Sequence, residues 1–194
     1  LSPEQLLLAQ KYNATVLDRT LFSQFLELCD VIIPSPGIDL RPYALIQEKF
    51  ISELDIFADH LTTKTIAVTG SVGKTTVVTL LTELLNRCGI KSCAAGNIGA
   101  PMLDLVATQQ NYEWIVLELS SFQLEHATRF APTIAAITNL FANHLDRHGT
   151  MLDYAQAKSQ IFRHQTDQEL AIIPQKFLEY FIQFTEIGRA SCRE

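Results

Sequence analysis

The clearest chemical feature of the sequence is a glycine-rich segment that follows an apolar run and precedes a helical pattern. Its residues are Gly70, Ser71, Val72, Gly73, Lys74, Thr75 and Thr76. Glycines let backbone N–H groups approach a phosphate chain, and a helix N-terminus, a lysine and a threonine hydroxyl suit phosphates and Mg²⁺. The segment predicts nucleotide-phosphate binding, although Val68 stands where the general pattern has its first glycine. The alternative is a glycine turn that happens to precede a helix.

An acidic side chain closes a second apolar run, where Glu118 follows residues 114–117. Ligands of open α/β sheets bind beyond the carboxyl ends of the strands, so Glu118 is a candidate site residue. The alternative is an acid that only solvates the end of its strand.

Histidine and lysine, which often act in catalysis, give weaker signals. A lone histidine is usually structural or exposed, and spacing does not distinguish His144 from the other four. Lys158 lies in an amphipathic helical pattern over residues 151–163, where a lysine normally faces solvent. Spacing alone therefore predicts an ordinary surface lysine.

Short apolar runs alternate with helical patterns along the chain, which predicts an α/β fold with a parallel sheet. The expected strands cover residues 30–33, 65–69, 90–95, 114–119, 133–138 and 170–173. The expected helices cover residues 21–29, 43–49, 74–88, 101–108, 122–128 and 151–163. Residues 50–59 are less regular, and the polar residues 60–64 are expected to link two domains.

The composition of the 194 residues, 47% hydrophobic and 19% charged, is that of an ordinary soluble globular protein. A formal net charge of −6 argues against a nucleic-acid partner, which would require a basic surface. No apolar run reaches the roughly 20 residues needed to cross a membrane. The four cysteines form no C-x-x-C pair, so neither a zinc site nor a disulfide framework is indicated, and a reduced cytoplasmic setting is expected.

The two ends of the sequence carry expectations of their own. The chain begins at Leu1, and we expect the natural start to lie further upstream. Residues 186–194, which include Cys192, fit no preceding pattern and are interpreted as a non-native tail. A natural loop is the alternative.

Five segments, in this order, resemble the Mur ligase family and its relative folylpolyglutamate synthetase. The glycine segment resembles the family's ATP loop, and residues 96–99 resemble its G-N-I-G turn. Residues 118–124, E-L-S-S-F-Q-L, resemble the strand-end segment of the D-glutamate-adding member. Residues 139–148 resemble the N-x-x-x-D-H-L-D-R-H loop, with Asn143 in place of the family's aspartate. Residues 154–158 resemble the Y-x-x-x-K helix that carries a carbamylated lysine.

The resemblance implies a domain organisation. Residues 61–185 would be part of a central ATPase domain, a parallel sheet that contains the P-loop. Residues 1–60 would be the second half of a smaller Rossmann-like α/β domain that binds the UDP substrate. By this resemblance, the family's third domain, which has a dinucleotide fold and binds D-glutamate, is expected to have no counterpart among these 194 residues. The 194 residues are therefore expected to be inactive alone.

The reaction that the resemblance implies joins D-glutamate to UDP-N-acetylmuramoyl-L-alanine through an acyl phosphate, in cytoplasmic peptidoglycan precursor synthesis. The implied cofactors are ATP, two Mg²⁺ ions and a CO₂-derived carbamate on Lys158. The implied partners are small molecules, with no nucleic acid and no membrane, and a monomer is expected.

The resemblance also assigns roles to individual residues. Catalytic roles fall to Lys74, His144 and Lys158, and residues 70–76 bind ATP. The Mg²⁺ ligands are Thr75, Glu118, His144 and Lys158, the last as a carbamate because an ammonium would repel the ion. The substrate-binding residues are Ser35, Gly37, Asn97, Ser120, Gln123 and His144. Asn97 and Gln123 could instead cap local backbone.

Two other functions stay open at this point. Another ligase of the family could use a different amino acid, although the segment at residues 118–124 argues against it. A nucleotide-binding module without ligase chemistry would make Glu118, His144 and Lys158 incidental.

Overall fold

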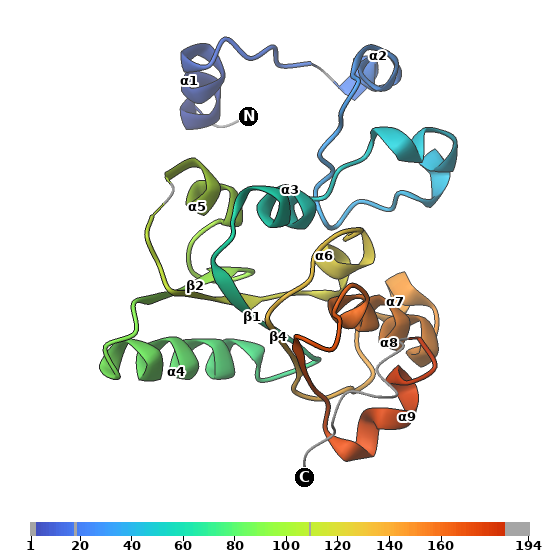
Figure 1. Cartoon of the computed structure of the whole chain (residues 1–194). Coiled ribbons are helices and arrows are strands. Elements are labelled where there is room, and N and C mark those ends of the chain that lie inside the picture. The colour runs from blue at the N-terminus through green and yellow to red at the C-terminus, as the bar shows by residue number, and fades with distance from the viewer. Residues whose placement is uncertain (1–2, 18, 109, 185–194) are drawn as a thin grey trace. The chain divides into compact units, whose positions relative to one another are not determined.

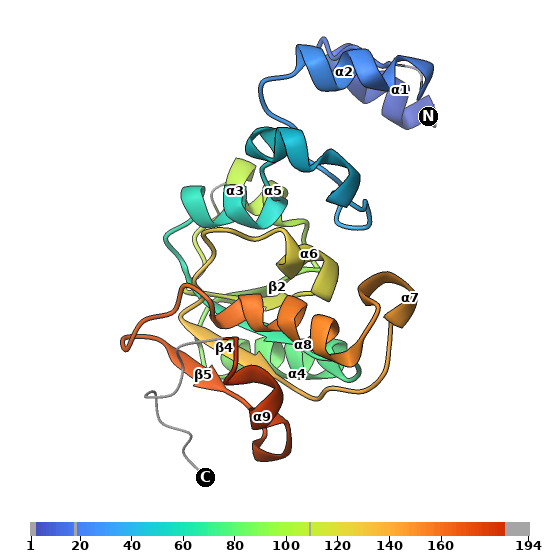
Figure 2. The same ribbon diagram turned by 90° about the vertical axis from the view of Figure 1, so that its right-hand side faces the viewer.

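The computed structural model describes residues 3–17, 19–108 and 110–184, which form two compact units (Figures 1 and 2). One unit comprises Leu1–Ile33 and Leu40–Phe50, and the other comprises Pro34–Asp39 and Ile51–Glu194. All the predicted site residues belong to the second, larger unit.

Among the described residues, a five-stranded parallel sheet with the order β2-β3-β1-β4-β5 forms the centre of the larger unit. Its strands are β1 (Lys64–Thr69), β2 (Ser92–Gly96), β3 (Trp114–Glu118), β4 (Ile134–Ile137) and β5 (Leu170–Ile172). The predicted parallel α/β fold is confirmed, and so are the five strands that were expected after residue 60.

Helices cover both faces of the sheet, as expected for parallel strands that are apolar on both sides. Figure 1 shows α4 on one face and α3, α5 and α6 on the other. The helices of this unit are α3 (Glu53–His60), α4 (Lys74–Arg87), α5 (Met102–Thr108), α6 (Ser121–Glu125), α7 (Leu145–His148), α8 (Met151–Ser159) and α9 (Leu178–Phe181). Two short 3₁₀ helices follow α8 and precede α9, at Gln160–Phe162 and Gln175–Phe177.

The central strand β1 shows how the two faces are packed. Ile66 and Val68 pack with Val78 of α4 in one apolar cluster. Ala67, between them, belongs to a larger cluster on the opposite face that includes Leu54 and Phe57 of α3. Because successive side chains of a strand point to opposite faces, β1 is buried on both sides and holds the loop that follows it rigidly.

The smaller unit contains α1 (Pro3–Lys11), α2 (Phe22–Leu28) and two 3₁₀ helices, Arg19–Leu21 and Arg41–Lys49. The helix expected at residues 21–29 is confirmed as α2. The strand expected at 30–33 is wrong, because within the described residues its pairing is one bridge between Ile32 and Phe50. Pro34 follows closely and has no N–H with which to continue the pairing. The helix expected at 43–49 is a 3₁₀ helix whose dihedral angles are non-helical at Tyr43 and Ile46.

The compact units divide at Phe50, before the polar linker at residues 60–64 where the sequence suggested a boundary. Residues 50–59 looked irregular in sequence, but most of them belong to α3 (Glu53–His60), which has Ser52 as its N-cap. Leu54 and Phe57 are 1% exposed and belong to the hydrophobic core of the larger unit. Burial of this helix therefore attaches residues 51–60 to the sheet, whereas the assignment of residues 1–60 to a Rossmann-like substrate domain stays a prediction.

The non-native tail predicted at residues 186–194 lies outside the described residues. In the part of the chain that is described, no helix has the length and apolar character needed to cross a membrane.

Candidate active site

The carboxyl ends of four strands bring the predicted site residues to one edge of the sheet. The glycine loop follows β1, Asn97 follows β2, and Glu118 is the last residue of β3. Residues 138–141 follow β4, which is the other neighbour of β1. Open parallel sheets bind their ligands at this edge, so the topology places the candidate chemistry where a ligand is expected.

The glycine loop has the backbone conformation that its glycines suggested. Gly70 and Gly73 have φ angles of +147° and +79°, which glycine adopts far more readily than other residues. A Cβ on Gly70 would lie 2.0 Å from Thr138 Oγ1, so this position also has no room for a side chain. The helix α4 begins at Lys74 without a side-chain cap, so the N–H groups of its first turn can face an anion.

Glu118 is the acidic centre of the site. Its side chain is 2% exposed, and its carboxylate accepts hydrogen bonds from the Thr75 hydroxyl at 2.8 Å and the Asn97 amide at 3.0 Å. Burial with two donors excludes the alternative of a solvated strand-end acid. The side chain of Asn97 binds this carboxylate rather than capping local backbone. A carboxylate next to a hydroxyl fits a hard cation such as Mg²⁺.

Lys158 is buried, so the alternative of a surface lysine is wrong. It is 1% exposed, and its ammonium donates to Gly70 O at 3.0 Å and Thr69 Oγ1 at 3.3 Å. Lys74 donates to the same Gly70 carbonyl at 3.0 Å. Burial and then the charge of Lys74 lower the pKa of Lys158 to about 7. Near neutral pH, a substantial fraction of Lys158 is therefore an uncharged amine.

Tyr154 and Ser71 line the same buried region. The Lys158 ammonium lies 4.5 Å from the centroid of the Tyr154 ring, and the Ser71 hydroxyl is 3.4 Å from the Tyr154 hydroxyl. Burial raises the pKa of Tyr154, against the opposing effect of the Ser71 hydrogen bond. Tyr154 is therefore a neutral aromatic wall of the site.

His144 lies at the exposed start of α7. Its φ angle is +53°, an uncommon value for a residue other than glycine, and its ring centroid is 5.1 Å from that of Phe122. In the described part of the chain, no hydrogen bond joins His144 to Glu118 or Lys158, and no group of three His, Cys, Asp or Glu side chains could hold a metal. Asn143, the departure from the family pattern, is also exposed.

Ser120 and Gln123 have a structural role at the start of α6. The Ser120 hydroxyl accepts the Gln123 N–H at 3.2 Å, and the Gln123 side-chain oxygen accepts the Ser120 N–H at 3.0 Å. This reciprocal pair is a capping box that satisfies two N–H groups at the start of the helix. Their predicted contact with substrate stays a prediction.

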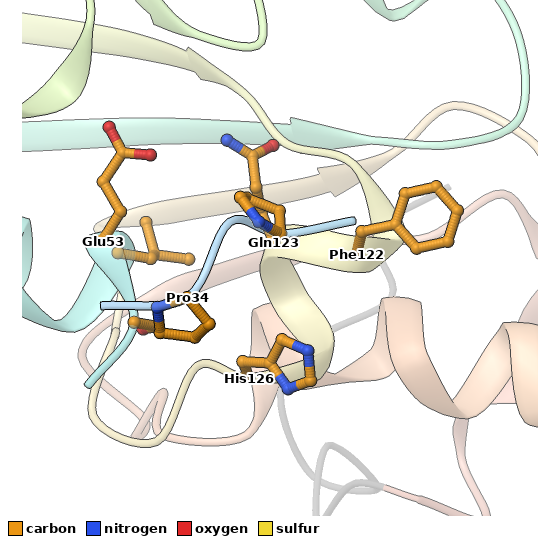
Figure 3. Close-up of a pocket in the computed structure, with 8 residues that line it drawn as sticks. Pro34, Glu53, Phe122, Gln123 and His126 are labelled. Atoms are coloured by element: carbon orange, nitrogen blue, oxygen red, sulfur yellow. The ribbon is translucent and has the colours of Figure 1, made fainter. Parts of the chain in front are cut away.

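Ser35 and Gly37 lie in a turn that also borders a small pocket. Figure 3 shows this pocket, which is lined by residues of the turn, the start of α3 and α6, among them Pro34, Glu53 and Gln123. Arg147 of α7 holds the turn, because its guanidinium pairs with Asp39 at 3.1 Å and with Glu125 at 3.3 Å.

Three side chains that sequence reasoning left without a role take part in the site. Asn139 and Thr138 bind the glycine loop, and Tyr154 faces Lys158. Asn139 and Tyr154 are the first residues of two motif segments, so their positions in those segments were the available signal. What each one contacts depends on the fold and could not be read from spacing.

Comparison with known proteins agrees with this geometry. Residues 68–187 match the family described as the Mur ligase middle domain. The UDP-N-acetylmuramoylalanine–D-glutamate ligase of Geotalea uraniireducens is 39% identical over 151 residues, which are 75% of this chain and 33% of that protein. The protein of the same name from Acidobacterium capsulatum is 44% identical over 149 residues, which are 74% of this chain and 32% of that protein. The chain thus spans about a third of the length of these relatives.

Solved structures share the fold at lower identity. One is the UDP-N-acetylmuramate:L-alanyl-gamma-D-glutamyl-meso-diaminopimelate ligase from Neisseria meningitides, with a TM-score of 0.58 and 17% identity over 95% of this chain and 66% of that one. Another is a MurF ligase from Thermotoga maritima in complex with ADP, with a TM-score of 0.53 and 19% identity over 86% of this chain and 42% of that one.

Proposed function

The chain belongs to the Mur ligase family, and we propose that it forms the nucleotide-binding part of an ATP-dependent amide ligase. The proposed reaction joins D-glutamate to UDP-N-acetylmuramoyl-L-alanine in peptidoglycan precursor synthesis. Because the chain spans about a third of the length of its curated relatives, the reaction is proposed for the whole protein.

One observation carries the proposal: Glu118 binds Thr75 and Asn97 beside the uncapped start of α4. The first turn of this helix offers N–H groups and a partial positive charge to the phosphates of ATP. In the proposed complex, Lys74 exchanges its carbonyl partners in the loop for the β- and γ-phosphates. Thr75 and Glu118 would hold Mg²⁺, which supplies charge neutralisation at the phosphates.

The proposed chemistry has two displacements. A carboxylate oxygen of the L-alanyl group attacks the γ-phosphorus of ATP, and the bond to the bridging oxygen breaks to release ADP. The amine of D-glutamate then attacks the acyl phosphate carbon, loses a proton and expels inorganic phosphate. Both steps move negative charge among oxygen atoms, so positioning and fixed positive charge account for most of the catalysis.

The buried lysine supports the proposed carbamate. Only an uncharged amine combines with CO₂, and Lys158, with a pKa of about 7, supplies one near neutral pH. The resulting carbamate would offer two anionic oxygens to a second Mg²⁺ ion. His144, whose ring lies exposed beside Phe122, is proposed to contact this second ion or the substrate carboxylate.

Two lines of support favour D-glutamate as the incoming amino acid. The curated relatives at 39% and 44% identity are both D-glutamate ligases by name. Residues 118–124 of this chain also resemble the segment of that member. The proposed substrate contacts are Ser35, Gly37, Asn97, Ser120, Gln123 and His144.

The test measures phosphate release by the whole protein with ATP, Mg²⁺ and UDP-N-acetylmuramoyl-L-alanine, with each of several amino acids in turn. Release is expected with D-glutamate only, and Lys74→Ala is expected to abolish it. The matched control is Lys91→Ala, which removes an exposed lysine directly before β2, at the amino end of that strand. Release with a different amino acid would identify another member of the family. A folded protein that binds ATP but releases no phosphate with any substrate would be a nucleotide-binding module without ligase activity.

A further inference from the structure

The glycine loop is bonded along its outer side to a segment from the neighbouring strand. Ser71 and Val72 both donate their N–H groups to Asn139 Oδ1, at 3.1 and 3.0 Å. Asn139 Nδ2 donates in turn to Val72 O at 2.9 Å. The carboxamide of Asn139 thus binds two successive N–H groups of the loop and the Val72 carbonyl.

This pattern requires the side chain of asparagine. The oxygen must face the two N–H groups and the nitrogen must face the carbonyl, so the partners fix the orientation of the amide. An aspartate at this position could accept from the two N–H groups, but it could not donate to Val72 O. An alanine would lose all three side-chain bonds and keep one backbone bond, in which the Ser71 N–H donates to Asn139 O at 3.2 Å.

Neighbouring residues strengthen the same connection. The Thr138 hydroxyl donates to Val72 O at 3.0 Å. The Ser71 hydroxyl accepts from the Phe141 N–H at 2.9 Å and donates to Phe141 O at 3.0 Å. Residues 138–141 therefore hold the loop at both Ser71 and Val72, and the same segment continues to His144.

The bonds to Asn139 distinguish the N–H groups of Ser71 and Val72 from those at the start of α4. Those of Ser71 and Val72 are bonded to protein, whereas α4 begins directly afterwards without a side-chain cap. The N–H groups of the first turn of α4 therefore have no side-chain cap and are available to an anion at the helix N-terminus. A loop held in this form before the ligand arrives avoids the entropy cost of ordering it on binding.

We propose that Asn139 is a positioning residue for nucleotide binding, which holds the glycine loop in its phosphate-binding form. This inference rests on the proposed function, because it assumes that the loop binds ATP. Asn139 acts through the backbone of Ser71 and Val72, and the phosphates themselves are bound by other groups.

The test compares Asn139→Ala with two controls in the full chain. Asn111→Ala removes an exposed asparagine in the connection between α5 and β3. Asp55→Ala removes a buried carboxylate that binds Thr128 and Arg129 far from the loop in sequence, and it reports on general loss of stability. Calorimetry gives the affinity for MgATP, and hydrogen exchange gives the protection of the Ser71 and Val72 amides.

Asn139→Ala is expected to weaken MgATP binding about tenfold, because the three side-chain bonds no longer hold the loop before the nucleotide arrives. Exchange should speed most at the Val72 amide, because the Ser71 N–H keeps its bond to the backbone oxygen of residue 139. Both controls should keep the wild-type affinity while they stay folded. Asn139→Asp should restore slow exchange of the two amides, because it keeps the oxygen that accepts from them. This conservative variant also covers the case in which Asn139→Ala does not fold.

Three outcomes would overturn the inference. Unchanged affinity in Asn139→Ala would show that the bonds to the loop are irrelevant to the nucleotide. Tighter binding would show that Asn139 obstructs the phosphate site. Unchanged exchange would show that Asn139 does not hold the loop. If the wild-type chain binds no MgATP, the proposed function fails, and the exchange comparison alone decides whether Asn139 holds the loop.

Discussion

The residues at this site show two ways in which a protein accommodates a buried ionisable side chain. Glu118 keeps its carboxylate in contact with two donors, the Thr75 hydroxyl and the Asn97 amide. Among the described residues, Lys158 donates to neutral oxygens and lies near a second cation, Lys74, so burial and this charge favour its uncharged form. The first arrangement suits a cation and the second suits an amine that reacts.

A pH dependence of stability follows from Lys158. Its pKa falls from an ordinary value near 10.5 to about 7 in the folded protein, so the unfolded chain binds more protons between these values. The contribution of Lys158 to the free energy of unfolding should therefore rise with pH, by up to about 1.4 kcal/mol per pH unit between the two pKa values. It should be lost as pH falls toward 7. Urea unfolding at pH 7, 8 and 9, in buffer freed of CO₂, measures this rise.

The matched comparison is Lys158→Met, which keeps the length of the side chain and removes the titrating group. The variant should lack this part of the pH dependence, so the difference in stability between the two proteins should change with pH. A difference that stays constant from pH 7 to 9 would show that Lys158 keeps an ordinary pKa.

Glu118 should link nucleotide affinity to Mg²⁺. Glu118→Gln keeps the shape of the side chain but removes its charge, so the gain in ATP affinity that Mg²⁺ gives should fall about tenfold or more. Binding of ATP in EDTA should change much less. The control is Glu113→Gln, which changes an exposed glutamate directly before the first residue of β3. An equal loss of affinity with and without Mg²⁺ would argue against a metal ligand.

At this scale, the sequence identified the charged residues better than the residues that orient them. Lys74 and Glu118 carry recognisable chemistry at recognisable positions. The contacts of Asn139 join residues 67 and 68 positions apart, which no local pattern encodes. Gln123 was predicted to contact substrate or to cap local backbone, and the structure shows the cap, with Ser120 as its partner.

Among the structural elements, the end of β2 has no room for a side chain at Gly96. Gly96 has φ +96°, and a Cβ there would lie 2.4 Å from Glu118 O. Gly89 at the end of α4 has φ +81° but open space around it. An alanine at Gly89 would meet backbone strain alone, whereas an alanine at Gly96 would meet both backbone strain and a steric clash.

Gly89→Ala should lower the free energy of unfolding by about 1 kcal/mol, from backbone strain alone. Gly96→Ala should cost more, by about 2 kcal/mol or beyond, because the strand backbone must also move. It should weaken MgATP binding in addition, since Asn97 and Glu118 would be displaced. Chemical unfolding and calorimetry measure both effects. Equal destabilisation by the two substitutions would contradict the predicted conflict at Gly96.

The helix α3 should depend on one buried carboxylate. Asp55 is 1% exposed and accepts hydrogen bonds from the backbone of Thr128 and Arg129 and from the Thr128 hydroxyl. Asp55→Ala should lower the free energy of unfolding by about 2–4 kcal/mol. Asp59→Ala, on the same helix, breaks only an exposed ion pair with Arg129 and should cost less than about 1 kcal/mol. Similar losses in both variants would show that Asp55 does not anchor α3.

The elements were predictable where apolar runs are buried in the sheet. The strands β1 and β3 lie inside the sheet, and their apolar runs predicted them closely. The run at residues 30–33 is similar in sequence, but only the single bridge to Phe50 pairs with it. The helix α3 was missed because its identity depends on the Ser52 cap and on tertiary burial more than on a long periodic pattern.

In the molecule as a whole, the strand order accounts for the site. The central strand β1 has β3 on one side and β4 on the other. The loop after β1 is therefore flanked by Glu118 from β3 and by residues 138–141 from β4. The parallel α/β class could be predicted from sequence, whereas this order of strands could not, because it depends on long-range pairing.

The most direct test of the proposed ligase uses UDP-N-acetylmuramoyl-L-alanine labelled with ¹⁸O in its carboxylate. The whole protein is incubated with this substrate, ATP, Mg²⁺ and D-glutamate, and mass spectrometry analyses the nucleotide product and the released phosphate. We expect a product extended by one glutamate residue and one ¹⁸O atom in each phosphate, because the activated oxygen leaves with the phosphate. Hydrolysis of ATP without a glutamyl product, or phosphate without the label, would contradict the proposed reaction.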